Sequence, residues 1–195
     1  EKLVGDIETL ESYYRDRGFL KFSIESSQVS LSRNKKSIFI TYNINEGEKY
    51  TINNANVIGE IPFEEEIYID IIDSLKDQTY SQAQITGIED FFINVLGNRG
   101  YAFAEVSGDA EVIDDTNEVK LTFSVVPGNK TYTRKILFTG NDVTQDHVLR
   151  REMRQFEGAW SSDNSIEAGK VRLERLGYFK EVNVETVPVV GTEDQ

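Results

Sequence analysis

The sequence predicts an α+β fold made of tandem modules, each with the element order β-α-α-β-β. Two observations predict it. A helical pattern followed by glycine, an aromatic residue and an extended run occurs three times, at Gly18, Gly100 and Gly177, which stand 82 and 77 residues apart. Further landmarks recur at nearly the same offset, and a constant period of this kind is typical of repeat architectures.

The second set of landmarks fixes the length of the repeat. The stretch NEGEKYTINNANVIGE aligns with VPGNKTYTRKILFTGN, so two glycines and a tyrosine recur at offsets of 81, 82 and 81 residues. The pairs are Gly47 and Gly128, Tyr50 and Tyr132, and Gly59 and Gly140. We therefore divide the chain into a first repeat (residues 1–46), a middle repeat (47–127) and a last repeat (128–195).

The middle repeat contains all five elements, beginning with a strand and a helix. The β-rich run Tyr50–Ile58 predicts the first strand, which ends at Gly59. Pro62 and the acidic triplet Glu64–Glu66 favour a helix start, because the first turn accepts proline and is stabilised by negative charge. Apolar residues at helical spacing extend this helix to Leu75.

A second helix and two strands complete the middle repeat. Ser81 followed by Gln84 is a capping-box pattern that predicts a helix start, and the glycines of GNRG predict its end. Tyr101–Val112 predicts a strand and Asp114–Asn117 a turn. The strictly alternating apolar residues of Val119–Val125 predict a half-buried strand.

The two flanking repeats fit parts of the same template. The first repeat has a helical pattern before its glycine and two strand patterns, Leu20–Leu31 and Ile38–Ile44. The last repeat has a strand from Tyr132, two helical patterns, of which one covers Val148–Gln155, and a strand at Val182–Val187. Neither flanking repeat contains all five elements, so we expect the chain to be a fragment of a longer protein.

Composition counts against several classes of function. The formal net charge of −13 argues against nucleic acid as a partner, because phosphate contacts need clustered cations. The sequence has no cysteine and one histidine, which excludes thiol chemistry and histidine clusters within it. It contains no phosphate-binding loop and no nucleophile motif. These absences count against a cofactor, a metal site and an enzymatic activity.

One stretch of this acidic chain is locally cationic. Residues 133–155 carry five Lys or Arg against three Asp or Glu, and VLRREMRQFEGAW occupies residues 148–160. A helix here would place Arg150 and Arg154 on one face, four residues apart. Such a face is either an ordinary solvent-exposed surface or a docking site for an acidic partner, and the residues alone leave both interpretations open.

Several of these motifs resemble the POTRA (polypeptide-transport-associated) domain family. The repeated β-α-α-β-β order with glycine and an aromatic residue before the second strand matches its pattern. The stretches VLRREMRQFEGAW, GKVRLERLGYF, ESYYRDRGF and FTGND resemble the POTRA domains of BamA-type outer-membrane assembly factors. The resemblance covers essentially the whole chain, and it implies the later part of a third domain, a fourth domain and most of a fifth.

The resemblance implies both a fold and a role. Each complete domain would be a three-stranded mixed sheet covered by two helices, with its last strand in the middle. The last repeat would lack this central strand, which leaves backbone groups of Tyr132–Thr139 and Val182–Val187 unpaired. The chain would be a non-catalytic scaffold on the periplasmic side of the outer membrane of a Gram-negative bacterium, preceding a C-terminal membrane β-barrel.

The resemblance also assigns a docking role to the cationic stretch. In this family the positions that match Arg150, Arg154 and Glu157 contact a BamD-type lipoprotein, so these three residues are the predicted lipoprotein-docking site. One family position differs, because a basic residue in the first strand of the domain is Leu137 here. This difference removes one cation from the predicted surface.

The second predicted site is an edge strand. The second strand of a POTRA-like sheet exposes its backbone and can accept an incoming strand by β-augmentation, which tolerates many sequences and would suit unfolded outer-membrane proteins. The candidates are Lys21–Val29 and Ala102–Val112, and an unused edge is the alternative. In the family, the edge of the third domain also contacts a BamB-type lipoprotein. The residues predicted for this edge are Lys21, Phe22, Ser23, Ile24, Glu25 and Ser26.

Two other functions stay open on the sequence. The first is the POTRA region of a related two-partner secretion or autotransporter-assembly transporter. The second is an enzyme with a substrate cleft between modules, against which the lack of a recognisable catalytic motif counts. Trp160 also has two interpretations, a partner anchor or a buried plug of its loop, and we expect the plug.

Overall fold

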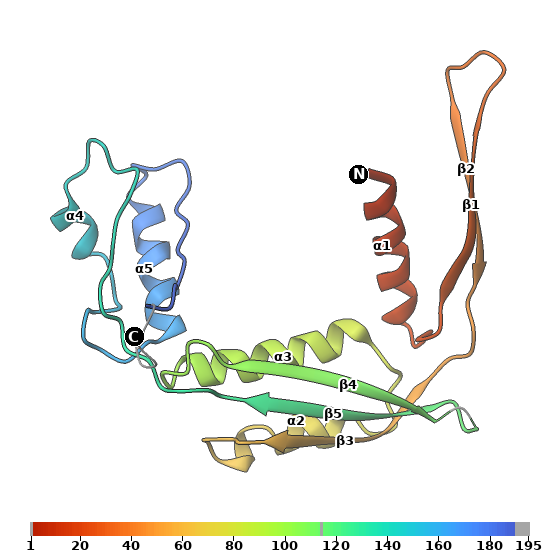
Figure 1. The fold of residues 1–195 in the computed structure, drawn as a ribbon, viewed down its shortest axis with the longest axis horizontal. Helices are drawn as coiled ribbons and strands as arrows, with labels where there is room; N and C mark the ends of the chain where they lie inside the picture. The colour runs from red at the N-terminus through yellow and green to blue at the C-terminus, as the bar shows by residue number, and fades with distance from the viewer. Residues whose placement is uncertain (1, 114, 190–195) are drawn as a thin grey trace. The chain divides into compact units, whose positions relative to one another are not determined.

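The computed structural model describes residues 2–113 and 115–189, and Figure 1 shows the order of their helices and strands. The elements are α1 (Lys2–Arg15), β1 (Ser23–Leu31), β2 (Ile38–Asn45), β3 (Thr51–Gly59), the 3-10 turn η1 (Glu65–Ile67), α2 (Ile69–Ser74), α3 (Gln82–Gly97), β4 (Glu105–Ile113), β5 (Glu118–Val126), α4 (Asp146–Arg150) and α5 (Asp163–Arg175). The middle repeat follows the predicted order, and the α+β fold class is confirmed.

The chain folds into two compact units whose boundary lies inside the middle repeat. The first unit comprises residues 1–58, 63–89 and 108–124, and the second comprises residues 59–62, 90–107 and 125–195. The boundary therefore passes through α3, β4 and β5. The first repeat hydrogen-bonds to the beginning of α3, in the first unit, and the last repeat hydrogen-bonds to Asn98, which follows α3, in the second unit.

In the first repeat, β1 and β2 form an antiparallel hairpin with one irregularity. Ile24 pairs with Ile44 and Ser26 with Asn43, so Glu25 is an extra residue in β1 and forms a β-bulge. The apolar alternation of β2 predicts one buried face, but Ile38 and Ile40 are both exposed. The reason is that this sheet has only two strands within the described chain.

Two aromatic residues attach the hairpin to α1. Phe22 is 5% exposed, and its ring stacks on that of Tyr14 with the ring centroids 4.2 Å apart. The Tyr14 hydroxyl donates to Glu46 Oε1 at 2.9 Å, and this hydrogen bond raises the pKa of the tyrosine. Because Phe22 precedes β1 and Glu46 follows β2, α1 is tied to both strands at the open end of the hairpin.

The middle repeat forms a three-stranded sheet in the order β3-β5-β4. β3 and β5 run parallel, since Thr51 N donates to Asn117 O near the start of both strands and Gly59 abuts Val125 near their ends. β4 and β5 are neighbours joined by a short turn, an arrangement that makes them antiparallel. The sheet is therefore mixed with its last strand central, as predicted.

β5 lies at the centre of the hydrophobic core. Val119, Leu121 and Phe123 are fully buried and Val125 is 1% exposed, so the predicted half-buried alternation is confirmed. Burying a side chain of this size stabilises a fold by roughly 1.5–3 kcal/mol. The helices α2 and α3, with the residue that follows α2, add to this core Ile72, Leu75, Ile85, Ile88, Phe92 and Leu96.

The helices of the middle repeat differ from the prediction in detail. The first is split, because the η1 turn precedes α2 and Tyr68 between them has φ −125°. The second begins as predicted, with Gln84 N donating to Ser81 Oγ at 3.3 Å. The Gln84 side chain bonds Gln78 instead of returning to the backbone of Ser81, so only half of the capping box forms. The first residue of the predicted turn at Asp114–Asn117 lies outside the described residues.

The last repeat has two helices and no assigned strand among its described residues. Leu149, Met153 and Leu173 form a small buried core. The residues packed against this core are Ile136, Phe138, Leu176, Phe179 and Val182. Among the described residues, neither Tyr132–Thr139 nor Val182–Val187 belongs to a strand ladder.

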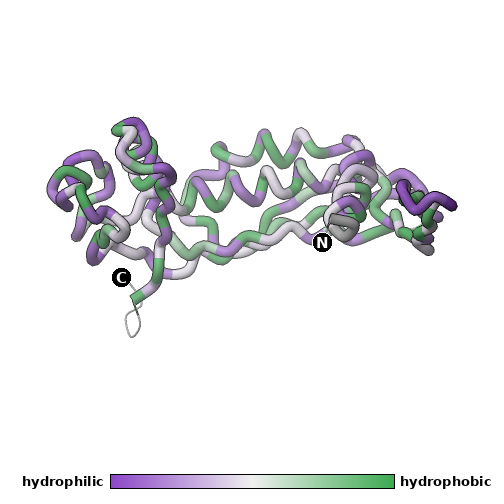
Figure 2. Tube along the Cα trace, turned by 90° about the horizontal axis from the view of Figure 1, so that it is seen from above, coloured by the Kyte–Doolittle hydropathy of each residue, from purple (hydrophilic) through white to green (hydrophobic). Residues whose placement is uncertain are grey.

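Hydrophobic and hydrophilic residues alternate along the trace in Figure 2 and do not gather in one long segment. Within the described residues, no helix combines the length and the hydrophobicity that a crossing of a bilayer requires.

We predict that adjacent valines of β5 differ sharply in their contribution to stability. Val125→Ala should lower the free energy of unfolding by about 2 kcal/mol, because it removes two buried carbon atoms and leaves a cavity. Val126→Ala is the matched control, since Val126 is 58% exposed and its truncation should change the value by less than about 0.5 kcal/mol. Denaturant titration measures both, and equal losses would contradict the central position of β5.

Candidate functional site

The cationic stretch is a short helix followed by a folded loop, so the predicted helix over Val148–Gln155 is wrong. α4 ends at Arg150, and the chain then turns. Contacts with the rest of the repeat fix two side chains in the turn that follows. Met153 is buried in the small core, and Arg172 on α5 binds Glu152, with its Nε at 3.1 Å and its Nη2 at 2.8 Å from Oε2. Arg150 and Arg154 therefore do not share a helix face.

Gln155 holds the rest of the loop together. Its side chain is buried, and Nε2 donates to the Trp160 carbonyl at 3.0 Å, while Oε1 accepts from Ser162 N at 3.1 Å. A buried side-chain amide that bonds two backbone groups fixes the path of the chain between them. Residues 151–162, between α4 and α5, are thus a defined loop, which we call the α4–α5 loop.

The α4–α5 loop pairs with one edge of the extended segment Tyr132–Thr139. Thr133 N donates to Ala159 O at 2.9 Å, Gly158 N donates to Thr133 O at 2.7 Å, and Tyr132 forms a β-bridge with Trp160. This edge therefore has backbone partners although no regular strand is assigned there.

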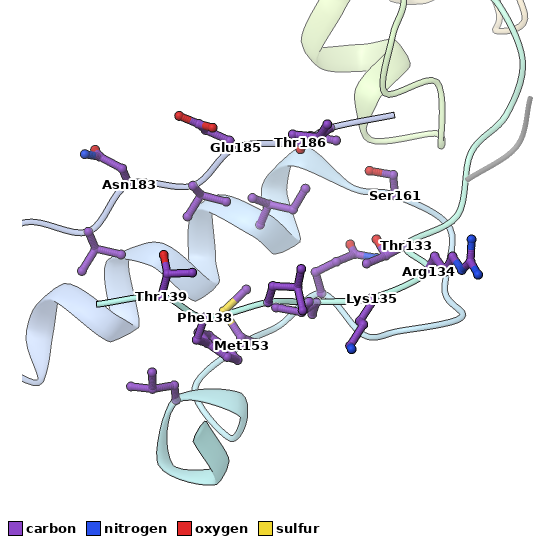
Figure 3. Close-up of a pocket in the computed structure, with 18 of the residues that line it drawn as sticks. Thr133, Arg134, Lys135, Phe138, Thr139, Met153, Ser161, Asn183, Glu185 and Thr186 are labelled. Atoms are coloured by element: carbon purple, nitrogen blue, oxygen red, sulfur yellow. The ribbon is translucent and has the colours of Figure 1, made fainter. Parts of the chain in front are cut away.

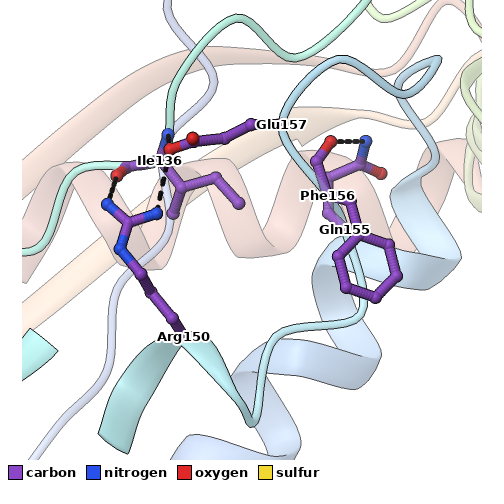
Figure 4. A network of polar contacts seen from close by, with 5 residues as sticks. All are labelled: Ile136, Arg150, Gln155, Phe156 and Glu157. Atoms are coloured by element: carbon purple, nitrogen blue, oxygen red, sulfur yellow. Dashed lines mark hydrogen bonds and ion pairs between the residues drawn. The ribbon is translucent and has the colours of Figure 1, made fainter. Parts of the chain in front are cut away.

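Arg150 and Glu157 continue this pairing with side chains, as Figure 4 shows. Ile136 N donates to Glu157 Oε1 at 2.9 Å, and Arg150 Nη2 donates to Ile136 O at 2.8 Å. Arg150 Nη1 also donates to Glu157 Oε1 at 2.9 Å. The two side chains thus satisfy both backbone groups of Ile136 and neutralise each other.

The electrostatics of the pair follow from this geometry. The hydrogen bond from Ile136 N, and then that from Arg150, hold the pKa of Glu157 below its usual range. Oε1 accepts both bonds, and within the described residues Glu157 Oε2 has no hydrogen-bond partner. One carboxylate oxygen of Glu157 therefore stays available at the surface.

Arg154 differs from Arg150 and Glu157, the other two predicted docking residues, in its exposure and pairing. It is exposed, and within the described part of the chain it has neither a hydrogen bond nor an ion pair. Leu137, which stands where the family has a basic residue, is 73% exposed. Of the three predicted docking residues, the structure brings Arg150 and Glu157 together and leaves Arg154 as an unpaired cation.

A second ion pair in this region was not predicted from the sequence. Glu152 binds Arg172 and, at 3.3 Å, Arg151, and the hydrogen bond from Arg172 lowers the pKa of this carboxyl group most strongly. Glu152 and Arg172 lie 20 residues apart in different elements, so no local spacing indicates the pair.

A groove of about 750 Å³ lies on the other edge of residues 132–139, between them and residues 182–189. Figure 3 shows Thr133, Phe138 and Thr139 along one side and Asn183, Glu185 and Thr186 along the other. Its apolar lining includes Leu149, Met153 and Leu173. The groove occupies the place that β5 fills in the middle repeat.

The predicted edge strands are sheet edges, with boundaries that differ from the prediction. β1 begins at Ser23, so Lys21 and Phe22 lie before it, and Phe22 is buried against Tyr14. Of the remaining predicted residues, Ile24 and Ser26 flank the bulge at Glu25. The regular part of this edge is Ser26–Leu31.

The second edge is more regular. β4 spans Glu105–Ile113 at the side of the sheet, and its residues alternate between exposed and half-buried. The segment Ala102–Ala104 precedes the strand, so the predicted range Ala102–Val112 begins too early.

Two minor expectations have clear outcomes. Trp160 is 59% exposed and packs edge-on to Tyr132, with centroids 6.5 Å apart, so the predicted buried plug is wrong. Across residues 2–113 and 115–189, no three His, Asp or Glu side chains gather as metal ligands would.

The fold and the site define a tandem-repeat α+β protein that presents sheet edges and a charged loop at its surface. The model of the POTRA family, described as "Surface antigen variable number repeat", matches residues 1–47, 50–128 and 131–195. The chain belongs to the POTRA family.

Known proteins that resemble the chain agree with this assignment. It is 29% identical to the outer membrane protein assembly factor BamA of Buchnera aphidicola over 184 residues, and 29% identical to BamA of Neisseria meningitidis serogroup B over 196 residues. These matches cover 94% and 100% of the chain. The chain spans only 30% and 25% of the length of these relatives.

Solved structures give the same result. POTRA domains three to five of Haemophilus influenzae BamA superpose with a TM-score of 0.91 at 30% identity, covering 100% of this chain and 77% of that one. BamA of Haemophilus ducreyi lacking POTRA domains 1–3 gives a TM-score of 0.60 at 35% identity, covering 75% of this chain and 28% of that one.

We predict that Glu157 makes the stability of the last repeat depend on pH. Its folded-state pKa is lowered from the ordinary value of 4.5, so its stabilisation is complete above about pH 4.5 and is lost as the pH falls through the folded-state pKa. Glu157→Gln should therefore show a smaller fall in thermal midpoint between pH 7 and about pH 3 than the unsubstituted protein.

The matched control for this experiment is Glu174→Gln, which removes one exposed carboxylate from α5. The control should keep the pH dependence of the unsubstituted protein. Identical profiles for Glu157→Gln and the unsubstituted protein would show that the bonds to Ile136 and Arg150 do not stabilise the loop.

Proposed function

We propose that the chain is the POTRA region of an outer-membrane protein assembly factor and acts as a periplasmic scaffold of a Gram-negative bacterium. The observation that carries this proposal is the superposition of the whole chain on POTRA domains three to five of Haemophilus influenzae BamA. The BamA relatives are much longer than this chain, and a C-terminal membrane β-barrel belongs to the same proposal.

The first proposed activity is docking of a BamD-type lipoprotein on the α4–α5 loop. Arg154 is the contact cation, because it is exposed and unpaired within the described chain. An unpaired Arg on an acidic protein attracts a carboxylate and binds it with two parallel hydrogen bonds. Glu157 supplies its free Oε2 as an acceptor for a partner's donor.

Arg150 has a positioning role in this proposal. Both of its terminal nitrogens are engaged by Glu157 and Ile136, so it holds the loop against the segment and orients the Glu157 carboxylate. A cation held in this way contributes little attraction of its own to an acidic partner, because Glu157 neutralises it. The docking charge is then concentrated on Arg154.

The second proposed activity is β-augmentation of unfolded outer-membrane proteins, with a BamB-type lipoprotein at the edge of the first repeat. Edge strands offer unpaired N–H and C=O groups to an extended segment. β4 supports this best, because it is a nine-residue edge strand without an irregularity in its burial pattern. In the first repeat, Ser26–Leu31 is the favoured part, since the bulge at Glu25 interrupts the edge before it.

We predict that Arg154→Glu weakens lipoprotein docking. Purified BamD-type lipoprotein from the same organism, titrated against the chain by calorimetry, should bind the variant at least about tenfold more weakly, because charge reversal replaces attraction by repulsion. The matched control is Arg175→Glu, which makes the same change of charge at an exposed position at the end of α5. Circular dichroism verifies the fold of both variants.

Equal binding by Arg154→Glu and the unsubstituted chain would reject the docking role of the α4–α5 loop. An equal loss in Arg175→Glu would mean that net charge, not this site, attracts the partner. Loss confined to Arg154→Glu supports the site.

We predict that an extended outer-membrane-protein peptide adds to a sheet edge. In an NMR titration of the chain with a nine-residue peptide from a barrel strand, alternate amides of β4 or of Ser26–Leu31 should shift, since only alternate residues point their N–H groups outward. The central strand β5 should not respond. The control peptide has the same composition with proline at alternate positions, which removes the donors, and shifts of similar size with it would argue against strand addition.

A further inference from the structure

The ends of α1 and α3 are built in the same way. α1 is followed by Asp16, Arg17 and Gly18, and α3 by Asn98, Arg99 and Gly100. Both glycines have positive φ, +97° and +98°, a conformation that L side chains rarely adopt. The backbone thereby turns out of the helix and directs its carbonyl group toward the following repeat.

Each glycine carbonyl accepts a hydrogen bond from the repeat that follows it. Tyr50 N donates to Gly18 O at 2.8 Å, and Thr131 N donates to Gly100 O at 2.8 Å. The equivalent of Tyr50 is therefore Thr131, one residue before the Tyr132 that the sequence alignment pairs with it. The two contacts lie in different compact units, so each unit contains one complete joint.

The residue two positions before each glycine makes a second bond across the joint. Asp16 Oδ1 accepts from Ala83 N at 2.8 Å, and Asn98 Oδ1 accepts from Asn164 N at 2.8 Å. Ala83 is the second residue of α3, and Asn164 is the second residue of α5. The side chain of one repeat thus reaches the first turn of a helix in the next.

The same helix turns are also capped from within their own repeat. Ser81 Oγ accepts from Gln84 N at 3.3 Å, and Ser162 Oγ accepts from Ser165 N at 3.4 Å. The first N–H groups of a helix have no partner inside it, and a serine cap satisfies only one of them. The side chain from the preceding repeat satisfies another, so each helix start is completed by two repeats.

We propose that the sequence Asx-Arg-Gly, in which Asx is Asp or Asn, is a docking element that joins one repeat to the next. It follows the last helix of a repeat, which is α1 in the first repeat and α3 in the middle repeat. Its partner in the next repeat has two parts. One is the first turn of a helix, at Ala83 or Asn164, and the other is the backbone N–H of Tyr50 or Thr131. This interaction is separate from lipoprotein docking and from strand addition. It sets the orientation of consecutive repeats at both joints of the chain.

The third helix end indicates what the element requires. α5 is followed by Leu176 and Gly177, and the position two residues before this glycine is Arg175. A guanidinium group has only donors and cannot accept a hydrogen bond from a backbone N–H. The Asx oxygen, and not the glycine alone, therefore distinguishes the two joints from the third helix end.

The experiment compares Asn98→Ala with Asn98→Asp, and Asp16→Ala with Asp16→Asn, in the 195-residue chain. Alanine removes the acceptor, whereas the matched substitutions retain Oδ1. By NMR, hydrogen exchange of the Asn164 amide should become about fivefold or more faster in Asn98→Ala, as expected for the loss of one cap. Asp16→Ala should do the same to Ala83, and in each variant the untouched joint is the internal control.

A second measurement separates docking from local capping. Residual dipolar couplings of amides on the two sides of a joint should fit one alignment tensor in the unsubstituted chain and two different tensors in the alanine variant of that joint. If hydrogen exchange of the amide becomes faster but both sides of the joint still fit one alignment tensor, the Asx residue only caps a helix. That result would overturn the proposal. Unchanged exchange would overturn it as well. If Asn98→Ala does not fold, Asn98→Ser, with a shorter side chain, gives the same test.

Discussion

The position of the central strand governs most of what is seen in this chain. In the middle repeat, β5 lies between β3 and β4, satisfies the backbone of both, and supplies four buried side chains. In the last repeat the corresponding place is a groove, and the segments beside it are not strands. In the first repeat the hairpin has two strands, and its apolar side chains are exposed. The three-stranded sheet thus encloses its core, whereas the other two repeats leave apolar side chains exposed or lining a groove.

The last repeat shows how an open sheet can still present a defined surface. The backbone of the α4–α5 loop hydrogen-bonds to Thr133, on one edge of residues 132–139. Further along this edge, the side chains of Arg150 and Glu157 hydrogen-bond to the backbone of Ile136. Two of the charges that suggest a docking site in the sequence, Arg150 and Glu157, therefore pair with each other in the fold. Exposure and lack of a partner distinguish Arg154 from Arg150, although both are arginines in one short stretch.

The sequence predicts the parts of this structure that depend on local pattern. The alternation from Val119 to Val125 and the start of α3 at Ser81 follow from periodicity and capping, and the repeat follows from constant offsets. The sequence does not predict the parts that depend on contacts between residues far apart along the chain. Glu152 is held by Arg172, which lies 20 residues further along, and the helix that Arg150 and Arg154 suggest ends at Arg150. The docking residues themselves come from family resemblance, because an exposed arginine carries no local signal of its role.

The bulge at Glu25 has a consequence for how copies of this chain behave at high concentration. The hairpin exposes Val29 and Leu31 on a strand whose outer edge has no neighbour in the described sheet, which is the usual starting point for edge-to-edge association. The extra residue bends and twists the strand, so two such edges cannot align along their full length. Any ordered assembly through β1 is thereby limited to the six residues beyond the bulge.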